Sequence, residues 1–156
     1  MKRLLLCAAA VLTLCSLGWH PAIAFDAPEG TGTAETSLGV VLTDADGLTL
    51  YTFDNDETDK SNCYGKCEKL WPIYLAPEDA QPIGDFKPIQ RDDGYKQWSY
   101  KGKPLYTWVK DKVKGDVTGQ GFRGTWYVAT PDGAGIKTGS GGDSSETDSS
   151  YGSYER

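Results

Sequence analysis

The chain has 156 residues, with 16 lysines and arginines against 22 aspartates and glutamates, which gives a net charge of −6. One domain is expected at this length. Residues 1–24 contain Lys2, Arg3 and the only histidine, so the remainder has no histidine and a net charge of −8. A histidine-based catalytic triad and any histidine-ligated metal or haem are therefore excluded from that remainder. Nucleic acid is disfavoured as a partner, because phosphate is repelled by a negative surface.

Residues 1–24 are typical of a secretory signal peptide. Two basic residues precede a mostly apolar stretch over residues 4–17, and the small-x-small run at residues 22–24 is a cleavage site before Phe25. A lipid anchor would need a cysteine that follows small residues, but Cys7 and Cys15 each follow a leucine. We therefore expect an exported protein, periplasmic or extracellular, soluble rather than lipid-anchored, with no transmembrane span in the mature chain.

The mature chain divides into three parts by composition. Residues 25–36 show no periodicity and are expected to form a flexible lead-in. Residues 37–131 hold nearly all the large apolar and aromatic side chains and are predicted to be the folded domain. Residues 132–156 are rich in Gly, Ser and Asp and are predicted to be a disordered tail.

Alternating and β-branched runs predict strands through most of the domain. The pattern predicts a hairpin of residues 38–43 and 48–53, a helix over 63–70 with Asn62 as N-cap, and a long surface connection over the proline-rich stretch 72–94. A second hairpin follows, with strands at 97–100 and 104–108 around Lys101-Gly102, and then a strand at 125–129. The predicted fold is mainly β: one small domain made from two related β-hairpin repeats plus one short helix.

An internal repeat supports this fold. Residues 47–56 align without gaps to residues 102–111 on the shared pattern Gly-x-x-Leu-Tyr-Thr-aromatic-x-x-Asp. A duplicated β unit explains the match, because a lone hairpin cannot bury its apolar face. The motif positions are Tyr51, Phe53 and Asp56 in the first copy and Tyr106, Trp108 and Asp111 in the second. Trp71 and Trp126 follow the two tyrosines at the same distance and are interpreted as repeat-related core residues.

These motifs, together with the stretches SNCYGKCEKLWP and KQWSYKGKPLYTW, resemble the bacterial secreted-repeat family. That family is described as predicted lipoproteins with a conserved Tyr-x-aromatic-x-x-Asp motif, and its function is not established. The resemblance covers residues 37–131 and implies that Tyr51, Phe53 and Asp56, with their second-copy counterparts, are signature positions. It assigns no catalytic role to any of them.

The cysteine pair Cys63 and Cys67 has two interpretations. Export implies an oxidising compartment, which favours a structural disulfide. The alternative is a redox dithiol or a soft-metal site, although the spacing is not that of thioredoxin-like proteins and no second pair completes a zinc site.

Other candidate sites lie among the aromatic and charged residues. Repeated aromatic positions are expected to pack, whereas the unduplicated Tyr95, Trp98 and Tyr100 are the candidates for exposed contact with a ligand such as a sugar. The acidic run 54–59, near Asp44 and Asp46, is interpreted as solvated turns, with a Ca²⁺ site as the alternative. The lysines between 101 and 114 are interpreted as a solvated face, with docking to an anionic partner as the alternative.

The function expected from the sequence is a non-enzymatic binding or structural domain of the cell envelope. No cofactor is expected, and the partner is an unknown envelope protein or small ligand. One alternative is a redox or electron-transfer accessory that uses Cys63 and Cys67. The other is a sugar- or calcium-binding module.

Overall fold

The computed structural model describes residues 25–133 and residue 135. The expected signal peptide lies outside the described residues, as does the expected tail apart from residues 132, 133 and 135. Seven strands, one α-helix and one 3₁₀ turn make up the described part of the chain. In chain order they are β1 (Gly32–Thr36), β2 (Gly39–Thr43), β3 (Tyr51–Phe53), α1 (Lys66–Leu70), β4 (Phe86–Gln90), β5 (Lys96–Tyr100), β6 (Lys103–Pro104), η1 (Phe122–Gly124) and β7 (Trp126–Val128).

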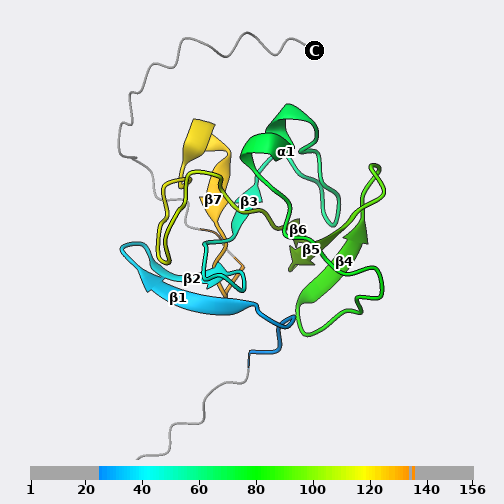
Figure 1. The fold of residues 1–156 in the computed structure, drawn as a ribbon, viewed down its shortest axis with the longest axis horizontal. Helices are drawn as coiled ribbons and strands as arrows, with labels where there is room; N and C mark the ends of the chain where they lie inside the picture. Colours follow the sequence, from blue (N-terminus) through cyan, green and yellow to red (C-terminus); the bar gives the residue numbers. More distant parts are fainter. Residues whose placement is uncertain (1–24, 134, 136–156) are drawn as a thin grey trace, which may run out of the picture.

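The strands form three small antiparallel sheets, β1–β2, β3–β7 and β4–β5–β6. The β3–β7 pair lies between the other two sheets, with α1 at one end of the molecule (Figure 1). The predicted fold class, a small mainly β domain of two related repeats with one short helix, is confirmed.

The prediction for the first repeat was partly wrong. Residues 32–36, expected in a flexible lead-in, form β1 and pair with β2 in register from Gly32–Thr43 to Thr36–Gly39. The predicted hairpin between residues 38–43 and 48–53 is present but short. The Asp44 N–H donates to the Leu48 carbonyl at 2.9 Å, the Leu50 N–H donates to the Leu42 carbonyl at 2.8 Å, and Thr43 forms an antiparallel bridge with Thr49. β1 was not predictable from its sequence, GTAET, because it contains no alternating pattern of large apolar side chains. The strand is stabilised by its backbone hydrogen bonds to β2.

The second repeat follows the prediction more closely. Lys101 and Gly102 connect β5 to β6 with φ angles of 49° and 80°, as a tight hairpin turn requires. The prediction of a long connection without strands over residues 72–94 was wrong in one part, since residues 86–90 form β4. Pro88 is tolerated there because β4 is an edge strand and needs no second ladder.

The predicted helix is shorter than expected. It begins at Lys66 after Gly65, whose φ is 60°, and Asn62 does not cap it. The Asn62 N–H instead donates to the Asp56 carboxylate at 2.7 Å. The predicted end before Pro72 is close, since the helix ends at Leu70.

The two repeats exchange their last strands. The β7 strand, at the end of the second repeat, pairs with β3 of the first, and Ile73, at the end of the first, bridges to Tyr106 of the second. In each half, three backbone segments hydrogen-bond to one another in a closed triangle. The triangles consist of Leu42, Leu50 and Ala129 in one half and of Trp98, Leu105 and Tyr74 in the other.

Tyr51 and Tyr106 lie where the halves meet. Each backbone N–H donates to the carbonyl of the other, at 2.8 and 3.0 Å. The molecule is therefore close to two-fold symmetric about this pair.

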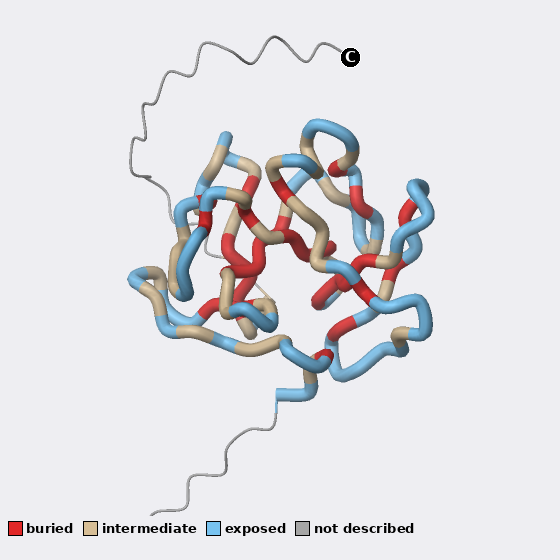
Figure 2. Tube along the Cα trace, in the orientation of Figure 1, coloured by how far each residue is buried: buried red, intermediate tan, exposed pale blue. Residues whose placement is uncertain are grey.

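Two buried clusters form the core (Figure 2). One surrounds the central tyrosines and includes Trp71, Trp108 and Trp126. The other contains Phe86, Leu105, Trp98 and Tyr100, among others. The prediction that Trp98 and Tyr100 are exposed was wrong, because both pack in this second cluster with exposures of 5% and 4%, whereas Tyr95 is 57% exposed.

Candidate functional site

The repeated tyrosines and aspartates bond across the two repeats. The Tyr51 hydroxyl donates to Asp111 Oδ2 at 2.6 Å, and the Tyr106 hydroxyl donates to Asp56 Oδ2 at 2.7 Å. Burial and the facing carboxylate raise the pKa of Tyr51, and the same two causes raise the pKa of Tyr106. Both hydroxyls therefore stay protonated and act as donors, which suits a role in joining the repeats.

The two aspartates also hold the loops that follow their strands. Asp111 Oδ1 accepts from the backbone and hydroxyl of Thr118 at 3.1 and 2.6 Å, much as Asp56 Oδ1 accepts from Asn62. Asp56 borders a cavity of about 200 Å³, and burial raises its pKa to about 6. Asp56 therefore both fixes the loop after its strand, through the Asn62 N–H, and makes a cross-repeat bond that the sequence did not predict.

The repeated aromatic residues form a stacked column between the repeats. Trp71 and Trp126 lie face to face with ring centroids 3.8 Å apart and planes 2° apart. Each is covered by the motif aromatic of the opposite repeat, Phe53 on Trp126 at 4.3 Å and Trp108 on Trp71 at 4.1 Å. Both tryptophans are almost fully buried.

A cavity of about 660 Å³ lies beside this column. Helix α1 and the turn η1, which occupy related positions in the two repeats, both contribute residues to it. The lining is mainly apolar and comprises Phe53, Asn55, Tyr64, Lys66, Cys67, Leu70, Trp71, Phe122, Arg123, Thr125 and Trp126. Its size and composition are those of small-molecule pockets.

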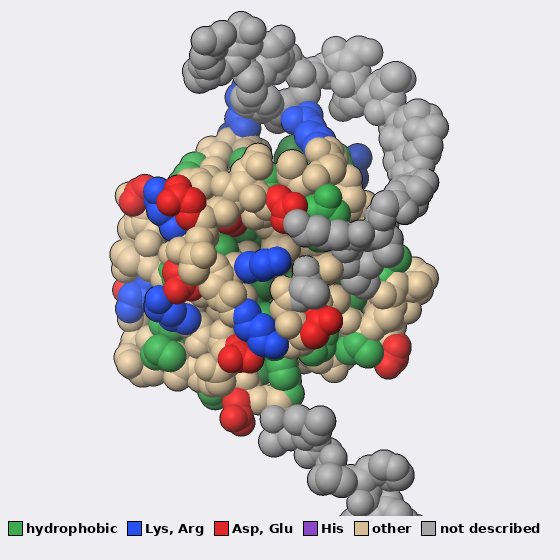
Figure 3. Space-filling view, turned by 180° about the vertical axis from the view of Figure 1, so that it is seen from behind, with side chains coloured by type: hydrophobic (Ala, Val, Ile, Leu, Met, Phe, Trp, Pro, Cys, Tyr) green, Lys and Arg blue, Asp and Glu red, His purple; other side chains and the backbone are tan. Residues whose placement is uncertain are grey.

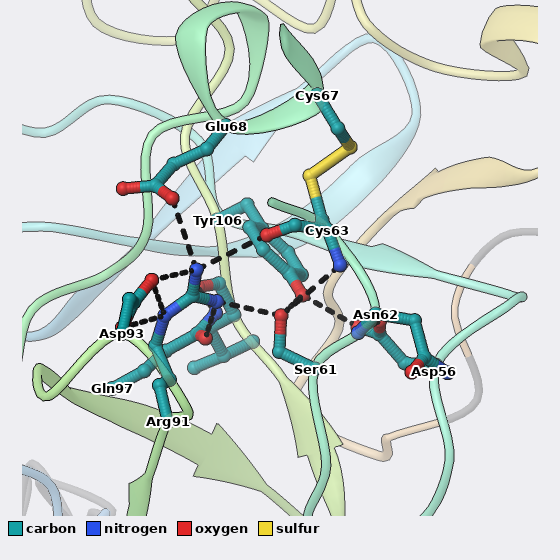
Figure 4. The surroundings of a disulfide bond; sticks show 11 residues. Asp56, Ser61, Asn62, Cys63, Cys67, Glu68, Arg91, Asp93, Gln97 and Tyr106 are labelled. Carbon is teal, nitrogen blue, oxygen red and sulfur yellow. Dashed lines mark hydrogen bonds and ion pairs between the residues drawn. A yellow bond between two sulfur atoms is a disulfide. The ribbon is translucent and has the colours of Figure 1, made fainter. Parts of the chain in front are cut away.

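The two cysteines form a disulfide that borders the cavity (Figure 4). Cys63 is fully buried, and Cys67 is half-buried and lines the cavity. No other cysteine lies within the described residues.

A buried arginine holds the loop that carries the disulfide (Figure 4). The Arg91 side chain has no exposed surface, and its guanidinium donates to the Cys63 carbonyl at 3.1 Å and to Glu68 at 3.0 Å. It also donates to Ser61 and Asp93, at distances down to 2.6 and 2.7 Å. These partners compensate a buried charge that would otherwise be costly.

The arginine is joined to the motif residues through Ser61. Ser61 Oγ accepts from Arg91 at 2.6 Å and lies 2.8 Å from the Tyr106 hydroxyl, which donates to Asp56. One hydrogen-bonded chain thus connects the disulfide loop to the cross-repeat pair. Arg91 could not be singled out from the sequence, because a single arginine between polar residues is typical of a surface side chain.

Carboxylates of the acidic turns bond to groups of the protein itself. Asp44 accepts from the backbone N–H groups of Asp46 and Leu48, and Asp59 pairs with Lys87 at 2.6 Å. Among residues 25–133 and 135, no group of three or more metal-ligating side chains is placed to hold a metal ion.

Lysines and arginines lie among carboxylates on the face that Figure 3 shows. Lys101, for example, donates to the Pro131 carbonyl at 2.9 Å and lies 3.6 Å from Asp85. This mixture is typical of a solvated surface.

Sequence reasoning missed most of the cavity. Phe122 and Arg123 belong to no motif, and Trp71 and Trp126 were interpreted only as core. One signal was present: Phe122 lies 55 residues after Cys67, so the two occupy the same place in the two repeats. Of the candidate contact residues Tyr95, Trp98 and Tyr100, none lines the cavity.

Comparison with known proteins agrees with this architecture. The sequence model of a family described as a secreted repeat of unknown function matches the chain twice, over residues 32–74 and 87–130. Each match ends where the exchanged strand of its repeat lies, and the pair confirms the duplication. No curated protein and no solved structure matches the chain. Within the described part of the chain, no helix has the length and apolar character needed to cross a bilayer.

Proposed function

The chain belongs to the secreted-repeat family, and we propose that it is an exported, non-enzymatic binding domain of the cell envelope that holds a flat apolar group in the cavity between its repeats. The observation that carries this proposal is a cavity of about 660 Å³ walled by aromatic rings. The cavity opens to solvent, so a small molecule can enter it. Pockets of this size with a mainly apolar lining and a few polar groups are typical of small-molecule sites.

The composition of the cavity supports binding rather than catalysis. Apart from the disulfide, its ionisable side chains are Tyr64, Lys66 and Arg123. The lining contains no carboxylate and no histidine, the groups that most often act as the general base in acyl or phosphoryl transfer. Aromatic walls with a few polar groups at the edge are typical of recognition sites.

Calorimetric titration of the mature protein with naphthalene methanol, a neutral flat ring, tests the proposal. We expect one site per chain, with a dissociation constant of about 0.1 to 1 mM for a compound of this size. Asn55→Trp, which adds a ring at an exposed residue of the lining, should abolish binding. Val113→Trp adds the same ring at a residue that is 63% exposed and outside the lining, and should leave binding unchanged. Absence of binding, or binding that Asn55→Trp does not weaken, would refute the proposal.

A redox role for Cys63 and Cys67 is the second candidate, because Cys67 borders the cavity. Access is required for thiol–disulfide exchange, and Cys63 is fully buried. Arg91 also fixes the loop through the Cys63 carbonyl. We therefore favour a structural bridge. Alkylation and intact-mass measurement after treatment with a mild reductant should find the bridge intact, and a bridge that opens readily would favour the redox role.

A further inference from the structure

We propose that the compound held in the cavity is a flat ring system that carries an anionic group, with the ring against the aromatic walls and the anion at Arg123 and Lys66. This inference rests on the proposed function and names the class of its ligand. Three features of the cavity carry it: the charge of its lining, the difference between the two repeats at its edge, and the backbone of Arg123.

The charge of the lining is opposite to that of the chain. The chain has a net charge of −6, yet the charged residues that line the cavity are Lys66 and Arg123, both cations. They come from α1 and η1, one from each repeat. The nearest acidic residue on α1 is Glu68, and its carboxylate is engaged by Arg91 at 3.0 Å. A negative group on the ligand would therefore meet cations at the edge of the cavity rather than carboxylates.

The cations lie where the two repeats differ. With the offset of 55 residues, Lys66 corresponds to Gly121, and Arg123 corresponds to Glu68. The stacked tryptophans behind them are the same in both repeats. The stacked tryptophans are thus explained by the duplication. Lys66 and Arg123 are not, because neither has a cationic counterpart in the other repeat, and an anionic ligand accounts for both.

The backbone at Arg123 is unfavourable for arginine. Its φ is 52°, in the left-handed region, between Gly121 and Gly124 at 72° and 67°. Glycine adopts this conformation without steric cost, whereas a long side chain does not. Strained non-glycine residues gather at functional sites, where a side chain is kept in spite of its backbone.

The strained residue is directed toward the cavity wall. The Arg123 guanidinium carbon lies 5.5 Å from the centre of the Phe122 ring, and Phe122 also lines the cavity. A guanidinium held against an aromatic ring is well placed to bind a planar anion, because it stacks on the ring and still offers its N–H groups. A carboxylate or sulfonate on a flat ring system matches both surfaces.

Three probes of one shape and different charge test this inference. The probes are naphthalene sulfonate, naphthalene methanol and naphthylmethylammonium, each titrated calorimetrically into the mature protein. We expect the sulfonate to bind about tenfold more tightly than the neutral alcohol, and the ammonium to bind more weakly than either. Half-molar sodium chloride should reduce the advantage of the sulfonate and leave the alcohol unchanged.

Substitutions at Arg123 supply the controls. Arg123→Gly should remove most of the preference for the sulfonate while the thermal midpoint stays at or above that of the wild type, because the strained backbone is relieved. Lys110→Gln removes an exposed cation outside the lining and should leave the preference intact. A residue kept only for stability would give the opposite result at Arg123, with a lower midpoint and unchanged binding.

The outcomes separate this inference from the proposed function. If the alcohol and the sulfonate bind equally well, or if Arg123→Gly leaves the preference unchanged, the anionic ligand is refuted and the binding cavity stands. If none of the three probes binds, both proposals fail. A probe affinity that falls as protein concentration rises would assign the cavity to a second copy of the chain and would overturn the small-molecule ligand.

Discussion

Replacing Tyr51 with phenylalanine removes a single hydroxyl from the centre of the molecule, where the two repeats meet. The Tyr51 side chain has no exposed surface, and its hydroxyl donates to Asp111 Oδ2 at 2.6 Å. It also accepts from the Gly119 N–H at 3.2 Å. The ring itself stays, so its contact with Trp71 is preserved. The substitution therefore isolates the hydrogen bonds.

The loss of stability has two sources, because removal of the hydroxyl deprives the Asp111 carboxylate of a donor and the Gly119 N–H of an acceptor. A hydrogen bond to a charged group contributes about 1.5 to 3 kcal/mol, and a buried donor left without a partner costs about 1 to 3 kcal/mol. Asp111 keeps its bonds to Thr118, and the Gly119 contact is long, so both values lie at the lower end. We expect Tyr51→Phe to lower the free energy of unfolding by about 3 kcal/mol.

Urea unfolding of the oxidised mature protein measures this loss, through a lower midpoint at unchanged slope. A double-mutant cycle with Asp111→Asn should give a coupling free energy of about 1 to 2 kcal/mol between the two side chains. A loss below about 0.5 kcal/mol, or strictly additive effects, would show that the cross-repeat bond does not stabilise the fold.

Three further predictions follow from buried groups. Burial raises the pKa of Asp56 from 3.8 to about 6, so its contribution to stability is greatest at low pH and is lost as pH rises through about 6. Between pH 4 and pH 7 the wild type should therefore lose about 1 to 2 kcal/mol relative to Asp56→Asn in urea unfolding, less than an unscreened shift would give. Removing the disulfide with Cys63→Ala and Cys67→Ala should cost about 2 kcal/mol, since the loop it closes is short; a loss near zero in the same assay would contradict this. A Cβ at Gly119 would lie 2.7 Å from the Trp71 ring, so Gly119→Ala should lower the thermal midpoint by about 8 °C or more, and an unchanged midpoint would mean that the ring can shift.

Local chemistry made part of this fold predictable. The turn at Lys101-Gly102 and the alternation around it were sufficient to place β5 and the turn, because both signals come from adjacent residues. The strand predicted at 104–108 was largely wrong, since β6 ends at Pro104 and Tyr106 makes only isolated bridges to Tyr51 and Ile73. The β3–β7 pair was not predictable, since it joins Tyr51 to Val128 and only the three-dimensional exchange of strands brings them together. β1 was not predicted because its residues are small or polar and show no apolar alternation.

The candidate site was harder to predict than the fold. Trp98 and Tyr100 are not repeated and were therefore predicted to be exposed, yet both pack in the second core cluster beside the repeated Leu50 and Leu105. The repeat correctly marked Trp71 and Trp126, but spacing cannot show that a hollow lies beside their stack. Buried charge is equally invisible in sequence, and Arg91 is the example.

Because each repeat pairs its last strand with the other repeat, neither repeat is a complete folding unit by itself. A lone repeat carries a strand whose partner belongs to another repeat, and a motif tyrosine whose aspartate does too. Two separate copies would satisfy each other only as a symmetric dimer, at a concentration set by their affinity. Fusion of the copies makes that association intramolecular. It also frees the two sides of the axis to diverge, so that Cys67 on one side corresponds to Phe122 on the other, and Glu68 corresponds to Arg123.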